Sequence, residues 1–169
     1  DSFYDIDKAR KGVALFMKKC DQPTLIADGV NPTSEVIYAR MHLLHEEVIE
    51  TLTAIYHVSI GNYFSDGKSW PQEIIDGCVD ILYIGHGTEA VIGEYDSYDI
   101  VGVSANKATL TNGITTAYEL RGVAHALSTA MDDLKMGYLG AEDSLGVLET
   151  LNTRAIQYAI DVAMELGLN

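Results

Sequence analysis

Apolar residues recur along most of the chain every three or four positions, which is the period of an α-helix. The clearest stretch contains one helix face made of Met41, Leu44, Val48, Leu52 and Ile55. Strict alternation of apolar and polar residues, which is typical of half-buried strands, is scarce, and there are only three prolines. The pattern predicts an all-α bundle of about five main helices, over residues 3–19, 34–56, 72–92, 115–135 and 143–166.

Local signals support the ends of these helices. Thr33 or Ser34 can cap the second helix, and Pro71 lies near the start of the third, where its missing N–H costs nothing. Residues 62–68 contain an Asp-Gly turn signal and are expected to form a loop.

The third predicted helix is apolar almost all round, so it is expected to be central and buried. Asp76 and Asp80 lie within it, and a buried carboxylate is costly unless it is paired or binds a metal. The other notable side chains of this segment are interpreted as structural: His86, Cys78 and Trp70.

The chain of 169 residues, 47% of them hydrophobic, is long enough for one domain with a sizeable core. A faint repetition joins the segment 38–45 to the segment 118–125, each with Tyr at its start and His at its end. This suggests a single domain, 1–169, with a metal-site half (1–95) and a degenerate copy (110–169) that has lost its acids. Two helical hairpins can also look alike by chance, without any duplication.

A net charge of −14 makes nucleic acid an improbable partner, because the phosphate backbone would be repelled. No run of about 18 uncharged apolar residues predicts a membrane span, and the charges among the first 20 residues argue against a signal peptide. Cys20 and Cys78 are isolated, which fits a reduced, cytoplasmic protein. The acid excess serves solubility, or part of it is neutralised by bound cations.

Two acidic clusters stand out within apolar surroundings. Glu46, Glu47 and Glu50 lie within one predicted helix, and Asp76 and Asp80 within another. Each cluster has the three- and four-residue spacing that places side chains on one helix face, and like charges so placed destabilise a helix unless something offsets them. If the two helices face each other, the carboxylates would form an all-oxygen cage suited to Mg²⁺ or Mn²⁺.

These clusters carry a family likeness. Over Ala9 to Gly93 the chain resembles the MazG-like, all-α nucleoside triphosphate pyrophosphohydrolases. The matching motifs are Glu46-Glu47-x-x-Glu50, with Arg40 upstream, and Asp76-x-x-x-Asp80-Ile-Leu-Tyr83 followed by Gly87-Thr88 and Gly93. The resemblance implies Mg²⁺-dependent hydrolysis of a nucleoside triphosphate to the monophosphate and pyrophosphate, in a cytoplasmic homodimer that cleans the nucleotide pool.

Two departures from the family pattern bear on the site. The superfamily often has Glu three residues before the final Asp, whereas this chain has Gly77 there. Asp76 lies one residue further away but on the same face, so it becomes the candidate fourth ligand. Family members also often carry downstream Asn and Lys residues that meet the phosphates, and Asn106 and Lys107 are the candidates here.

The expected roles follow from this likeness and from metal chemistry. Glu47, Glu50 and Asp80 are expected to bind Mg²⁺, with Asp76 next, and Glu46 is a further ligand or the group that orients the attacking water. Plainer interpretations stay open: Glu46 as a solvated acid, Asp80 in a salt bridge, Lys107 as a surface lysine. Arg40 binds phosphate or pairs with a carboxylate.

Metal sites of other kinds are disfavoured by the sequence. A di-iron carboxylate bundle uses Glu-x-x-His motifs, and no histidine here has an acid three residues before it. His42 and His45 lack a further nitrogen or sulfur ligand, which disfavours zinc. Two interpretations without catalysis stay open: a nucleotide- or metal-binding regulatory module with a decayed site, and a purely structural helical dimer.

Overall fold

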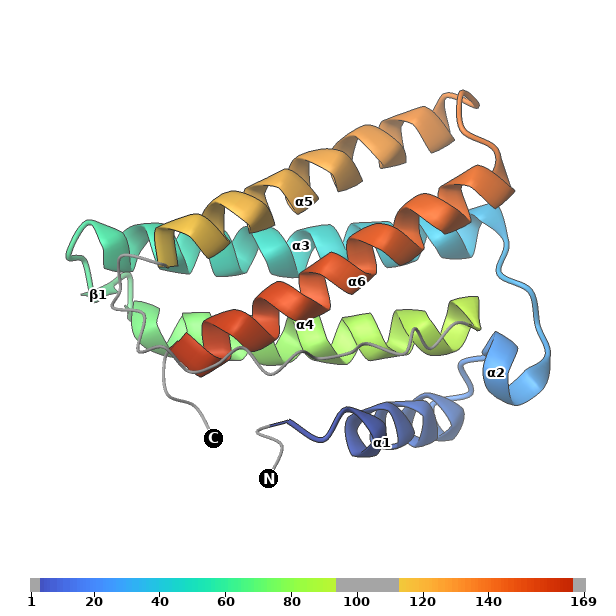
Figure 1. Cartoon of the computed structure of the whole chain (residues 1–169), viewed down its shortest axis with the longest axis horizontal. Coiled ribbons are helices and arrows are strands. Elements are labelled where there is room, and N and C mark those ends of the chain that lie inside the picture. Colours follow the sequence, from blue (N-terminus) through green and yellow to red (C-terminus); the bar gives the residue numbers. More distant parts are fainter. Residues whose placement is uncertain (1–3, 94–112, 166–169) are drawn as a thin grey trace.

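The computed structural model describes residues 4–93 and 113–165. Within these ranges the chain forms six helices and one short hairpin, which confirms the predicted all-α bundle (Figure 1). The helices are α1 (Ile6–Lys19), α2 (Leu25–Asp28), α3 (Ser34–Ser59), α4 (Trp70–Ile92), α5 (Gly113–Lys135) and α6 (Ala141–Glu165). The hairpin pairs β1 (Phe64–Ser65) with β2 (Lys68–Ser69).

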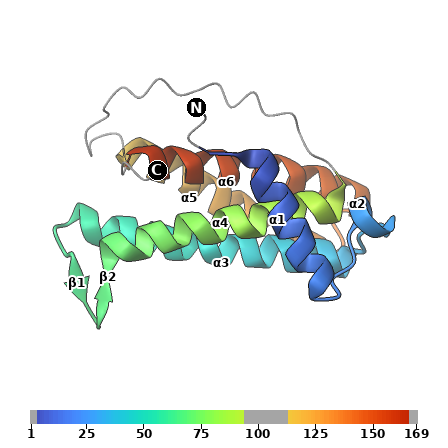
Figure 2. The same ribbon diagram turned by 90° about the horizontal axis from the view of Figure 1, so that it is seen from below.

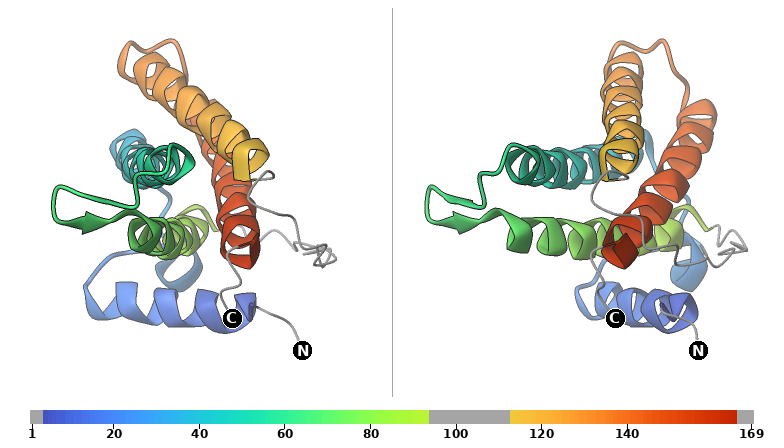
Figure 3. Two further views of the ribbon diagram at one scale, coloured as in Figure 1. Left: turned by 90° about the vertical axis from the view of Figure 1, so that its left-hand side faces the viewer. Right: turned by 60° about the vertical axis from the view of Figure 1, so that its left-hand side comes forward.

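Helices α3 and α4 run antiparallel as the central pair, and α5 and α6 cover one side of it (Figures 1 and 3). Helix α1 crosses α4 on another side, as Figure 2 shows. The core lies where α3, α4, α5 and α6 meet, and its fully buried side chains include Met41, Leu44, Val48, Ile81, Leu120, Leu127 and Leu148. One face of the α3–α4 pair therefore packs against α5 and α6, and another is exposed to solvent.

Capping residues mark the ends of α3 and α4. The Thr33 hydroxyl accepts a hydrogen bond from the Val36 N–H, which confirms the predicted cap of α3. Gly93 ends α4 in the left-handed conformation at φ 81°, which strains any residue with a Cβ.

The loop predicted over 62–68 is wrong in part, because residues 64–69 form the β1–β2 hairpin. Asp66 and Gly67 both have positive φ (55° and 75°), as a tight two-residue hairpin turn requires. The Asp-Gly signal was therefore a hairpin signal. Two residues per strand give too little apolar alternation for the pattern to be recognised.

Helix α4 is central, as predicted, since it contacts α1, α3 and α6. Cys78 and His86 are each 1% exposed, and Trp70 is the buried first residue of α4, where its indole N–H donates to Ser65. These three residues are structural. No helix in the described ranges combines the length and the apolar character needed to span a bilayer.

Candidate functional site

The α3–α4 contact determines which acids face each other. Gly77 lies so close to α3 that a Cβ built on it would be 2.2 Å from Thr51 Oγ1, and Thr51 is fully buried. The Thr51 hydroxyl donates to the Glu47 carbonyl oxygen at 2.7 Å, one turn back along α3. Because the helices are antiparallel, this contact places Glu47 and Glu50 across from Asp80.

Repulsion between negative charges links the carboxylates of the two helices. Partial burial raises the pKa of Glu47 most, and the charges of Asp80, Glu50 and Glu46 raise it further. Partial burial also raises the pKa of Asp80, followed by the charges of Asp76 and Glu50. All five predicted acids thus belong to one cluster, which we call the carboxylate cluster.

The cluster lies on the solvent-exposed side of the α3–α4 pair, and this corrects one expectation. Asp76 and Asp80 were predicted on a buried helix, but both are exposed, as are Glu46 and Glu50, while Glu47 is half-buried. Helix α4 buries the faces that meet α3, α6 and α1 and leaves a polar stripe outside. An amphipathic stripe on a mostly apolar helix is hard to see in sequence, because Val79 and Tyr83 also lie exposed.

Two members of the cluster lie at its margin. The Gln72 side-chain amide donates to Asp76 at 3.2 Å, and His42 lies 3.4 Å from a Glu46 oxygen. The Asp76 charge acts on Asp80 but does not appear among the causes that raise the pKa of Glu47. Glu47, Glu50 and Asp80 therefore form the centre, with Asp76 on one side and Glu46 on the outer surface.

Neutralising Glu47 should stabilise the metal-free protein. The pKa of Glu47 is raised above 4.5 in the folded protein, so folding favours the neutral carboxyl group. This contribution to stability is fully present below the pKa of the unfolded chain, and it is lost as pH rises through the pKa of the folded protein. In a chelator at pH 7, Glu47→Gln should raise the free energy of unfolding by roughly 0.5 kcal/mol, which discounts for solvent screening. The gain should vanish below about pH 4, and thermal melts across pH would measure it.

The control for this variant is Glu35→Gln, because Glu35 lies in the first turn of the same helix, where a negative charge is favourable. That change should not stabilise at any pH. Equal melting shifts for the two variants would show that the carboxylate cluster carries no net repulsion.

The Thr51–Gly77 contact excludes a side chain at position 77. A side chain there would collide with the buried Thr51, so no acid fits while the helices stay this close. Asp76, one residue earlier on α4, is exposed instead.

Gly77→Ala should cost about 1–3 kcal/mol of unfolding free energy, because the added methyl must push α3 and α4 apart. Gly12→Ala is the matched control, since Gly12 lies within α1 with nothing within 4 Å of its added Cβ. That change should instead stabilise by about 0.5–1 kcal/mol. Urea unfolding measures both, and an unchanged midpoint for Gly77→Ala would refute the close-contact geometry.

Arg40 of α3 reaches toward Gly87 of α4. Its Nη1 would be 3.0 Å from a Cβ on Gly87, and its Nη2 is 3.5 Å from the Gln22 side-chain oxygen. Burial lowers the Arg40 pKa, while the nearby Tyr83 raises it. No carboxylate in the described part of the chain is within salt-bridge distance of Arg40, so its guanidinium is not committed to the cluster.

The donor set suits a hard divalent cation, because all the clustered side chains offer oxygen. Within residues 4–93 and 113–165, no three Asp, Glu, His or Cys side chains converge closely enough to form a metal site as they stand. Side-chain rotation of the exposed Glu50 and Asp80 is therefore part of any binding. Asn106 and Lys107 fall outside the described residues.

Sequence reasoning missed a second polar cluster, between α1 and α4. The buried Glu89 accepts hydrogen bonds from Arg10 Nε at 3.0 Å and from Nη2, and it also contacts His86 Nδ1. The Tyr4 hydroxyl lies 2.8 Å from His86 Nε2. The only signal was an acid within the apolar stretch at the end of α4, and nothing in the sequence pairs it with Arg10, 79 positions away.

Comparison of the chain with protein-family models, with curated proteins and with solved structures gave no match.

Proposed function

We propose that this protein hydrolyses a nucleoside triphosphate, NTP or dNTP, to the monophosphate and pyrophosphate with bound Mg²⁺, or Mn²⁺ in its place. The observation that carries the proposal is the approach of Glu47 and Glu50 of α3 to Asp80 of α4, where the charge of Glu50 raises the pKa of both Glu47 and Asp80, and the charge of Asp80 also raises that of Glu47. Like charges held together in this way need a cation to offset them. A triphosphate, itself an anion, could approach such a surface only with a cation between them.

Each acidic residue has a proposed role in metal binding or in activation of water. Glu47, Glu50 and Asp80 would hold the metal, with Asp76 beside them. When bound, Mg²⁺ would neutralise phosphate charge, polarise the attacked phosphorus and lower the pKa of a bound water. Glu46, or whichever carboxylate is left uncoordinated, would orient the attacking water and take its proton.

Arg40 is the proposed phosphate-binding residue. It lies seven residues before Glu47, two turns along α3. Its guanidinium can bind two phosphate oxygens in parallel, and Gln22 and Tyr83 lie beside it. Asn106 and Lys107 remain candidates for the same task. The proposal thus has metal at the carboxylate cluster and phosphate contacts on the side nearer α1.

The likeness to the MazG-like enzymes extends the proposal to nucleotide-pool cleaning in the cytoplasm by a homodimer. Exposed apolar side chains beside the hairpin offer a surface for a second copy, among them Ile60, Tyr63 and Phe64. Such a cluster on a surface is typical of an association site.

The direct test incubates the protein with a panel of NTPs and dNTPs plus Mg²⁺ and measures pyrophosphate. We expect release from at least one nucleotide, loss of release in EDTA, recovery on adding Mg²⁺, and no release by Glu50→Ala. Absence of turnover on every nucleotide, with wild type and Glu50→Ala alike, would refute the enzyme proposal. Mg²⁺-dependent nucleotide binding without turnover would favour a regulatory module.

A further inference from the structure

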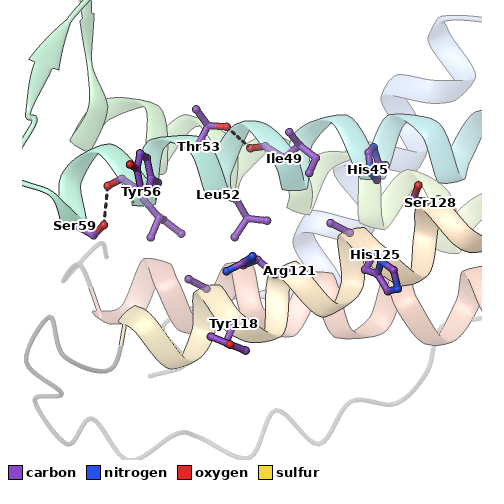
Figure 4. A pocket seen from close by; sticks show the side chains of 13 residues that line it. His45, Ile49, Leu52, Thr53, Tyr56, Ser59, Tyr118, Arg121, His125 and Ser128 are labelled. Atoms are coloured by element: carbon purple, nitrogen blue, oxygen red, sulfur yellow. Dashed lines mark hydrogen bonds between the residues drawn. The ribbon is translucent and has the colours of Figure 1, made fainter.

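A cavity of about 770 Å³ lies between α3 and α5 (Figure 4). Its α3 wall includes Ile49, Leu52 and Tyr56, and its α5 wall includes Ala117 and Ala124. None of the five clustered carboxylates lines it. Glu47 projects on the side of α3 opposite to Ile49, because two residues turn a helix by about 200°, whereas Glu46 lies one turn from Ile49 beside the cavity wall. The cavity is therefore distinct from the centre of the proposed metal site.

The size and walls of this cavity fit a small ligand. Pockets of roughly 300–1,000 Å³ that are mostly apolar, with a few polar groups, are typical of small-molecule sites. The hydroxyls of Thr53 and Ser59 already donate to carbonyl oxygens of their own helix, at 2.8 and 2.7 Å. The walls thus offer mainly apolar surface.

The lining differs in charge from the rest of the protein. Arg121 is its charged side chain, His45 and His125 add imidazole groups, and none of the lining residues is Asp or Glu. The whole chain has 25 acids against 11 Lys and Arg, so a lining with a guanidinium and no acid departs from the average of the chain. An anion would meet a guanidinium here and no carboxylate in the wall.

Arg121 is positioned to meet such an anion. Figure 4 shows its side chain reaching into the space between α5 and α3, toward Leu52. Its guanidinium carbon lies 5.7 Å from the centroid of the Tyr118 ring, a cation–π contact that leaves the N–H donors available. Among the described residues, no carboxylate forms a salt bridge with it.

We infer that the α3–α5 cavity binds a small amphipathic anion, with an acyl or aryl body against Ile49, Leu52 and Ala124 and one carboxylate or phosphate head on Arg121. The apolar walls provide affinity for the acyl or aryl body of the ligand, and the Arg121 guanidinium favours an anionic head group. The site is independent of the proposed nucleotide chemistry.

Isothermal titration of the full chain with four ten-carbon ligands tests the inference: decanoate, decyl phosphate, decanol and decyltrimethylammonium. The two anions should bind saturably, more tightly than decanol, and the cation should not bind. The stronger of the two anions identifies the head group as carboxylate or phosphate. Amide shifts in ¹⁵N spectra should be centred on residues 45–59 and 117–128.

Variants then test the contribution of the Arg121 charge separately from that of the apolar cavity walls. Arg121→Gln should weaken anion binding about tenfold, the worth of one charge-assisted hydrogen bond, and leave decanol binding unchanged. Arg154→Gln is the matched control, an exposed arginine on α6 outside the cavity. Ile49→Asp places a carboxylate on an exposed wall position and should abolish anion binding without unfolding the chain.

Three results would overturn the inference. One is the lack of saturable anion binding below about 1 mM. Another is equal binding by Arg121→Gln and Arg154→Gln. The third is concentration-dependent self-association in sedimentation that Ile49→Asp abolishes while ligands have no effect, because a second copy would then fill the cavity.

Discussion

Asp80→Asn should lower kcat/KM for pyrophosphate release about a thousandfold, which corresponds to roughly 4 kcal/mol of barrier. Asp80 is the carboxylate of α4 that interacts with Glu47 and Glu50 of α3, so it joins the two halves of the proposed metal site. Asparagine keeps the size and one oxygen but removes the charge that holds the cation. Initial rates over a range of Mg²⁺ concentrations should show activity partly restored at high Mg²⁺.

The matched control is Glu73→Gln, an acid on the same helix that pairs with Lys68 at 3.0 Å. Glu73 does not appear among the charges that raise the pKa of Glu47 or Asp80, so its loss should leave kcat/KM within about twofold, a change of under 0.5 kcal/mol. Full activity in Asp80→Asn would show that the α4 ligand is wrongly assigned. Equal losses in both variants would point to a general charge effect rather than a ligand.

Glu89→Ala should destabilise the fold by about 3–5 kcal/mol, the cost of breaking a buried ion pair. The side chains of Arg10 and Glu89 are 10% and 3% exposed, and Glu89 also contacts the fully buried His86. Removing the carboxylate takes away the anion that accepts two hydrogen bonds from the buried Arg10 guanidinium. Urea unfolding would measure the loss, and proteolysis should show α1 released before the rest.

An exposed ion pair provides the comparison. The Lys68–Glu73 side chains are 52% and 32% exposed, so Glu73→Ala should cost less than about 1 kcal/mol. The double variant Arg10→Met with Glu89→Leu should be more stable than Glu89→Ala alone, since no unpaired charge is then buried. If the free energy of unfolding of Glu89→Ala is within about 1 kcal/mol of the wild-type value, the Arg10 side chain is hydrated in the variant, and the ion pair does not stabilise the packing of α1.

The buried pair also matters for the surroundings of Arg40. Helix α1 brings Met17 against Gly87 and sets Phe16 edge-on to Tyr83, with ring centroids 5.8 Å apart. Arg40 reaches across to the same point of α4. Loss of Glu89 should therefore disturb the position of Arg40 before the carboxylates.

Sequence periodicity was sufficient for the five long helices, because their buried faces repeat over many turns, but not for the single-turn helix α2. The carboxylate cluster was also predictable, since α3 and α4 each carry a compact acidic set and a short connection makes them antiparallel neighbours. The exposure of Asp76 and Asp80 was not, because it depends on where α1 and α6 pack. The pairing of Glu89 with Arg10 depends on the docking of α1, which no local pattern encodes.

The Thr51–Gly77 contact also limits the order in which this site can change. A carboxylate at position 77 cannot be introduced while Thr51 is present, because the helices would have to separate and the core between them would open. The side chain at position 51 must become smaller first, and only then can an acid move inward by one position. An acid could therefore be introduced at 77 by one mutational route, with the reverse order passing through a poorly folded intermediate.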